Sequence, residues 1–137
     1  MVLEMAGKTD PDLFLAGAGR AVITPPVGFV IDGPEHGARA STGVLDDLLA
    51  RVVVLDSKGT RVVLVSLDVW GLSPALSASI NSAAGKAAGV DPSSVWLTAT
   101  GNATSPPLWR SDPQYAAYSA YLPEQIAGAV TAAVGAL

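Results

Sequence analysis

The chain has 137 residues, half of them hydrophobic, and its twelve acidic and eight basic residues give a formal net charge of −4. This length suits one domain with one core, and the acidic balance excludes a nucleic-acid surface, which needs a basic stripe. The chain contains no cysteine, so disulfides, thiolate zinc sites and cysteine nucleophiles are excluded as well.

Residues 1–14 are predicted to form a flexible or docking tail that precedes one α/β domain over residues 15–137. Lys8, Asp10 and Asp12 interrupt the tail, which therefore lacks the apolar run of a secretory signal. No stretch of the chain reaches the roughly 20 apolar residues of a membrane span. We therefore expect a cytoplasmic protein without membrane insertion.

The first half of the domain is predicted to contain three strands. Residues 15–26 form a strand that two consecutive prolines stop, because proline cannot donate ladder hydrogen bonds. A glycine-rich loop over residues 27–47 follows. Residues 50–56 and 60–70 are β-branched runs around a short turn that ends in glycine, which predicts a hairpin. Both runs are apolar on both faces, so we expect the sheet to be covered on each side.

The second half alternates helix, strand and helix. A serine–proline cap at residues 73–74 begins a helix that Gly89 ends, and residues 93–100 form the next strand. An aspartate–proline pair at residues 112–113 precedes a segment predicted to be helical until Pro123, after which an apolar stripe follows at four-residue spacing: Ile126, Val130, Val134 and Leu137. The element order predicts an α/β fold with a mixed β-sheet and packed helices.

Polar residues follow two of the predicted strands. Ligands bind beyond the carboxyl ends of strands in open α/β sheets, so Asp68 and residues 100–105 line one cleft if their strands are neighbours. Asp68 is a candidate catalytic base or metal ligand, or else a structural cap. The hydroxyls of the second segment are nucleophiles only beside a base, and otherwise satisfy a turn. The predicted ligand-binding residues here are Thr100, Gly101, Asn102, Ala103, Thr104 and Ser105.

Further candidate site residues lie outside these strand ends. His36, the only histidine, is a candidate catalytic acid or base, or a surface residue. Arg39 and Arg110 are suited to hold a carboxylate or phosphate, or to form surface ion pairs. Trp109 is predicted to join three tyrosines in an aromatic cluster that lines a ligand pocket or a subunit contact: Tyr115, Tyr118 and Tyr121.

Four segments together, in order and at matching spacing, resemble the N-terminal domain of the neutral/alkaline non-lysosomal ceramidase family. They are GAGRAVITPPVGF, TGVLDDLLARVVVLD, RVVLVSLDVWGLS and VWLTATGNATSPP, and the resemblance extends over about residues 16–135. Members of that family are zinc amidohydrolases that cleave the N-acyl bond of ceramide. The resemblance therefore implies the ceramidase N-terminal α/β fold.

The same resemblance puts the family's metal chemistry in doubt. Its pattern Ala-Thr-His-Thr-His-Ser-Gly-Pro falls on residues 99–106, where Gly101 and Ala103 occupy both histidine positions. Leu45 stands where a histidine often precedes the aspartate. The scaffold positions do match: Arg20, Asp46, Arg51, Asp68 and Pro106. Since the family takes its other zinc ligands from later sequence, we expect this chain to have no metal and no cofactor.

Three functional hypotheses follow. The favoured one is a non-catalytic ceramidase-like domain, a pseudoenzyme that acts as a homo-oligomeric assembly or binds a small molecule or a partner. The second is a metal-independent enzyme, hydrolase-like or lyase-like, which acts on an amide, lactone or carbonyl compound with Asp68 or His36 as the acid or base. The third is a zinc hydrolase that a neighbouring subunit completes.

Overall fold

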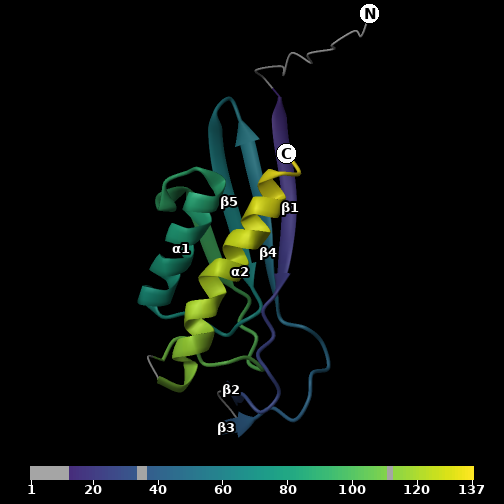
Figure 1. Cartoon of the computed structure of the whole chain (residues 1–137), viewed down its shortest axis with the longest axis vertical. Helices are drawn as coiled ribbons and strands as arrows, with labels where there is room; N and C mark the ends of the chain where they lie inside the picture. The colour runs from purple at the N-terminus through teal and green to yellow at the C-terminus, as the bar shows by residue number, and fades with distance from the viewer. Residues whose placement is uncertain (1–12, 34–36, 111–112) are drawn as a thin grey trace, which may run out of the picture.

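The protein is a mixed α/β domain in which two helices pack on one face of a four-stranded sheet (Figure 1). The computed structural model describes residues 13–33, 37–110 and 113–137. The sheet order is β1-β4-β5-β6; the first three strands are antiparallel and β6 runs parallel to β5. The predicted fold class is confirmed. The strand bounds are β1 Phe14–Val22, β4 Leu49–Ser57, β5 Thr60–Leu67 and β6 Val95–Ala99.

A small hairpin occupies the segment that was predicted to be a plain loop. Strands β2 (Val30–Gly33) and β3 (Gly37–Ala40) pair in an antiparallel manner beyond one end of the main sheet (Figure 1). The base of the hairpin is closed by Gly28, whose N–H donates to the Ser41 carbonyl at 2.8 Å. The loop prediction was wrong because each strand has only four residues, too few to show a periodic pattern in the sequence.

Helix α1 (Pro74–Ala88) begins and ends where the sequence predicted. The Ser73 hydroxyl oxygen accepts a hydrogen bond from the Leu76 N–H at 3.3 Å, and Pro74 occupies the first turn. Gly89 ends the helix in the left-handed conformation with φ of 70°. The short 3-10 helix η1 (Pro92–Ser94) then leads into β6, which places α1 as the crossover between two parallel strands.

Helix α2 (Ala116–Val134) passes through the proline at which the sequence predicted an interruption, and it includes most of the apolar stripe predicted after that proline. It follows the 3-10 turn η2 (Pro113–Tyr115) and runs without interruption through Pro123, so the expected stop at this proline was wrong. Proline removes one backbone donor, but the buried side chains on either side of it, Leu122 and Ile126, hold the helix on the core. Within the described residues, no helix has the length and apolar character needed to cross a membrane.

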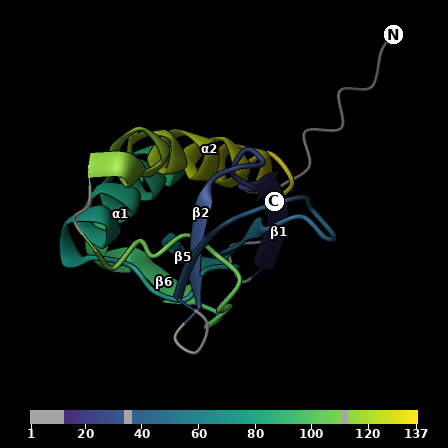
Figure 2. The ribbon, with the colours of Figure 1, turned by 90° about the horizontal axis from the view of Figure 1, so that it is seen from below.

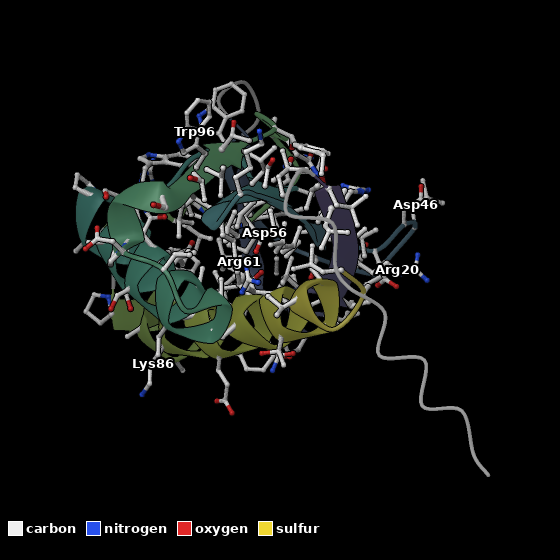
Figure 3. The ribbon with its side chains drawn as sticks, turned by 90° about the horizontal axis from the view of Figure 1, so that it is seen from above. Arg20, Asp46, Asp56, Arg61, Lys86 and Trp96 are labelled. Carbon is white, nitrogen blue, oxygen red and sulfur yellow. The ribbon has the colours of Figure 1, made fainter. Side chains whose placement is uncertain are left out.

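The core lies between the two helices and the inner face of the sheet. Its largest fully buried side chains come from both layers: Ile23, Val52, Val54, Val63, Val65, Leu67, Ile80, Leu122, Ile126 and Val130. An ion pair lies at the border of the core, next to the turn between β4 and β5, where Arg61 Nε donates to Asp56 Oδ2 at 2.8 Å (Figure 3). Arg61 Nη1 also donates to the Ala88 carbonyl at 2.9 Å, where a cation suits the negative end of α1.

The opposite face of the sheet is bare in the described part of the chain. Figure 2 shows both helices on the same side of the sheet. Side chains on the other face stay open to solvent, with Val53 38%, Leu64 36% and Trp96 68% exposed. The expectation that both faces are covered was therefore wrong for the described residues. Several outward positions of β4 and β5 carry large apolar side chains, and for this reason the sequence suggested that both faces were covered.

Two glycines of β1 allow α2 to lie directly on the sheet. A Cβ atom added to Gly17 would lie 1.9 Å from the Ala133 carbonyl oxygen, and one added to Gly19 would lie 2.1 Å from the Ala129 carbonyl oxygen. These distances are shorter than any van der Waals contact, and the atoms in the way belong to the helix backbone. The alternating glycines thus set the separation between strand and helix.

We expect Gly19→Ala to lower the free energy of unfolding by about 1–3 kcal/mol, the usual cost of overpacking, because α2 must move away from β1. Gly128→Ala is the matched control. It lies within α2 with no atom near its added Cβ, so it should raise stability by about 0.5–1 kcal/mol through helix propensity. Urea unfolding measures both values, and equal effects of the two variants would contradict this packing.

Candidate functional site

The parallel pairing of β5 and β6 brings their carboxyl ends to one edge of the sheet. Leu67 pairs with Ala99, and the Thr100 N–H donates to the Leu67 carbonyl at 2.9 Å. Asp68, which follows β5, therefore lies beside the loop that follows β6. The strands β5 and β6 are neighbours, and this was the condition for Asp68 and residues 100–105 to line one cleft.

The loop after β6 turns sharply at Gly101. This residue has φ of 78°, a left-handed conformation that favours glycine. The N–H groups of Gly101 and Asn102 both donate to the Val69 carbonyl, at 3.0 and 3.2 Å. A side chain at position 101 would have open space around it but a strained backbone. The loop geometry thus depends on the residue that replaces the first histidine of the ceramidase pattern.

The hydroxyl groups of Thr104 and Ser105 form hydrogen bonds that hold the loop in place. Asn102 Oδ1 accepts from the Thr104 N–H at 3.0 Å and from Thr104 Oγ1 at 2.8 Å. Ser105 is fully buried; its hydroxyl accepts from the Trp70 N–H at 2.9 Å and donates to the Asn102 carbonyl at 2.8 Å. These bonds match the structural interpretation of the hydroxyls as groups that satisfy a turn.

Asp68 holds the ends of β4 and β5 together. Arg51 Nη1 donates to both of its carboxylate oxygens, at 2.9 and 2.8 Å, and the Leu49 N–H donates to Oδ2 at 3.1 Å. The Asp68 side chain is 17% exposed, whereas that of Arg51 is 53% exposed. Both carboxylate oxygens already accept N–H donors, so the geometry fits a structural cap better than a free base.

A pocket of about 540 Å³ lies in front of these residues, between the strand ends, the β2 strand and residues 43–48. Its lining contains three carboxylates and a single guanidinium, that of Arg51, so negative charge dominates. The carboxylates are those of Asp46, Asp47 and Asp68. Hydroxyl and amide groups come from four further lining residues: Thr24, Ser41, Asn102 and Thr104. Val44 and Leu45 form an apolar part of the pocket wall, and both side chains are exposed to solvent.

Thr24 fixes the far wall of the pocket. Its hydroxyl donates to Asp47 Oδ1 at 2.7 Å and accepts from the Leu48 N–H at 2.9 Å. These bonds tie the segment before β4 to the end of β1. Sequence reasoning missed Thr24, Ser41 and Asp47 as pocket residues, although a threonine directly before two prolines marks where the backbone leaves the sheet.

The predicted aromatic cluster is two separate groups. Trp109 packs against Trp70 with ring centroids 6.3 Å apart, and the Arg110 guanidinium lies 5.7 Å from the Trp109 centroid. Tyr115 and Tyr118 instead contact Phe29, at 5.5 and 5.4 Å, which joins the β2–β3 hairpin to α2. The single cluster predicted from sequence was therefore wrong, and Tyr121 is 45% exposed.

The Tyr118 phenol anchors the second aromatic group. Its hydroxyl donates to the Ile23 carbonyl. Burial, with a smaller contribution from Tyr121, raises the pKa of Tyr118 well above its usual value. The phenol therefore remains a protonated donor throughout the physiological range, in a structural role.

Several predicted site residues lie elsewhere. Thr100, Ala103, Ser105, Trp109 and Arg110 are not part of the pocket lining. Arg39 is exposed on β3, opposite Ile31. His36 lies outside the described residues. Of the residues proposed for ligand binding, the structure brings Asn102 and Thr104 to the pocket together with Asp68.

The residues around the loop do not fit the zinc ion that the ceramidase resemblance implies. A catalytic zinc needs about three protein ligands. Gly101 and Ala103 carry no donor atom. Over the described ranges, no group of three or more histidine, cysteine, aspartate or glutamate residues is placed to hold a metal.

If Asp68 is a structural cap, Asp68→Asn should lower the free energy of unfolding by about 1 kcal/mol, because the ion pair with the exposed Arg51 is lost and the bond to the Leu49 N–H weakens. Asp46→Asn removes an exposed carboxylate from the same pocket and should stay within about 0.5 kcal/mol of the wild type. Chemical unfolding of both variants provides the comparison. Wild-type stability in Asp68→Asn would argue against the capping role.

Comparison with known proteins identifies the fold. No family model matches the sequence, and no curated protein matches it. The crystal structure of neutral ceramidase from Pseudomonas aeruginosa superposes with a TM-score of 0.75 and 19% identity, over 93% of this chain and 22% of that one. A ceramidase complexed with C2 gives 0.58 and 18%, over 89% and 20%. The chain thus spans about a fifth of the length of these structures, and it has the fold of that segment of a ceramidase.

Proposed function

We propose that this chain is a non-catalytic ceramidase-like domain that binds a small polar molecule and assembles with copies of itself. The observation that supports the proposal is the pocket at the carboxyl ends of β5 and β6. Polar side chains line this pocket, which lies at the position where open α/β folds bind ligands. At the loop positions that match the family's histidines, however, Gly101 and Ala103 offer no side-chain donor.

The lining favours a ligand that carries amino and hydroxyl groups. The Arg51 charge is neutralised by Asp68, whereas Asp46 has an exposed carboxylate on the pocket wall. An ammonium group would form a charge-assisted hydrogen bond with such a carboxylate. The Ser41 hydroxyl accepts from the Gly28 N–H and can still donate, and the Thr104 hydroxyl donates to Asn102 Oδ1 and can still accept. A volume of about 540 Å³ lies within the range of small-molecule sites.

The contacts around the pocket support binding rather than turnover. A metal-independent enzyme needs a base within reach of the bond that is broken. Asp68 is engaged by Arg51 and by the Leu49 N–H, and the Ser105 hydroxyl is buried in the loop. A zinc hydrolase would require a neighbouring subunit to supply the ligands that Gly101 and Ala103 lack.

Self-association is supported by the bare face of the sheet. Single apolar side chains on a surface are ordinary, but contiguous apolar patches mark interaction sites. Val53 lies opposite Leu64 in the β4–β5 register, and Leu64 lies opposite Trp96 in the β5–β6 register, so the three exposed side chains form one row across the sheet. The row ends at Trp96 on the edge strand β6, and a closed symmetric oligomer that pairs this edge would cover the most exposed of the three side chains.

We expect the purified chain to release no fatty acid from an N-acylsphingosine, with or without added zinc, because the loop offers no imidazole to bind the metal. A coupled assay for free fatty acid measures this, with a ceramidase as the positive control. Activity that appears with zinc and disappears with a chelator would contradict the non-catalytic assignment.

Binding of 2-amino-1,3-propanediol should shift the backbone amide resonances of Asn102 and Thr104, and glycerol, which lacks the amine, should bind more weakly. Asp46→Asn should lower the affinity for the amine about tenfold, the effect of losing one hydrogen bond to a charged group. Glu124→Gln, which removes an equal charge from an exposed position on α2, is the control. Equal losses in both variants would show only a long-range charge effect.

A further inference from the structure

Strand β6 has a free edge. In the described part of the chain it pairs with β5 alone. Because the Thr100 N–H points to Leu67 of β5, the two-residue alternation of a strand directs the backbone groups of Trp96 and Thr98 to β5 as well. The N–H and C=O groups of Val95, Leu97 and Ala99 therefore face the open edge. Such an edge is a template for another strand.

This edge lacks the features that usually protect one. Its sequence, Val-Trp-Leu-Thr-Ala, contains no charge and no proline, and its register with β5 runs without a bulge. Trp96 is 68% exposed and projects on the side of the sheet away from the helices (Figure 3). By contrast, β1, the strand at the other edge of the sheet, contains a charged residue, Arg20, of the kind that discourages pairing with another strand.

Open space flanks β6 on both faces of the sheet. On the helix side, a groove of about 560 Å³ lies between β6 and α1, bounded by Leu72, Ser77 and Asn81. The buried Asn81 Oδ1 has no hydrogen-bond partner among the described residues. On the other side, an apolar hollow of about 410 Å³ is bounded by Val53, Leu64 and Trp96. The side chains of an added strand would enter both spaces.

We propose that a second copy of this chain covers the edge, with the two β6 strands paired antiparallel about a two-fold axis at Leu97. In this register Leu97 lies opposite the partner subunit's Leu97, and Val95 opposite the partner subunit's Ala99. Each of these residues directs its backbone to the edge, so every outward N–H and C=O of β6 is paired. The inference rests on the proposed self-association and names its interface.

The side chains are compatible with this register. Trp96 lies opposite the partner subunit's Thr98, on the outer face, where the hydroxyl side chain is small enough to lie beside the indole. β6 carries no charge, so two copies meet without repulsion. A two-fold contact of this kind closes on itself, and it joins the two sheets into one continuous sheet.

Opposite charges on the paired positions test the register. Trp96→Lys/Thr98→Lys and Trp96→Glu/Thr98→Glu each place like charges opposite one another across the axis, so each variant alone should be monomeric. An equimolar mixture places lysine opposite glutamate and should restore a dimer. Light scattering after size exclusion gives the mass, expected near 13.8 kDa for each variant and near twice that for the wild type and the mixture. Circular dichroism verifies that the exposed substitutions leave the fold intact.

Leu64→Lys is the control, because Leu64 lies on the same outer face but on β5, away from the edge. It should leave the dimer intact. A wild-type dimer that persists in both edge variants, or that only Leu64→Lys disrupts, would overturn the edge interface but keep self-association. Monomeric edge variants whose mixture stays monomeric would overturn the register. A monomeric wild type would overturn the interface and the self-association together, without affecting the amine-binding measurement.

Discussion

The parallel pairing of β5 with β6 is the constraint on which both the pocket and the open edge depend. Parallel neighbours need a crossover connection, which α1 supplies while covering the inner face of the sheet. Their carboxyl ends then meet, so Asp68 and the loop after Ala99 form one wall of the pocket. Because β6 is the last strand of the sheet in the described residues, its other edge is left open.

This chain has the fold of a ceramidase segment, and our proposal separates that fold from the ceramidase chemistry. The fold is retained over nearly the whole chain at 19% identity, and Asp68 keeps a position in it as the cap that joins β4 and β5 through Arg51 and the Leu49 N–H. The loop that follows β6 turns at the left-handed Gly101, and residues 100–105 contain no imidazole. A shared fold does not fix the function, because function depends on the side chains at the site, and this is the basis on which we propose a binding role.

Local signals explain the parts of the structure that were predicted correctly. The β4–β5 hairpin is encoded by two β-branched runs around Lys58 and Gly59, and α1 by the Ser73 cap and the Gly89 stop, all within a few neighbouring residues. The failures have a non-local cause. Pro123 stays inside α2 because the core holds Leu122 and Ile126 on either side of it, and the β2–β3 hairpin is tied to α2 by the contact of Phe29 with Tyr118.

The sequence by itself determined the α/β class and the order of the main elements, because both follow from residue type and local spacing. Its resemblance to the ceramidase family implied that Gly101 and Ala103 stand at histidine positions. Only the tertiary structure decided which face of the sheet the helices cover, since the outward positions of β4 and β5 also carry large apolar side chains, such as Val53 and Leu64. It also decided that Thr24, from the end of β1, completes the pocket. That residue is distant in sequence from Asn102, and only the sheet topology brings the two to one cavity.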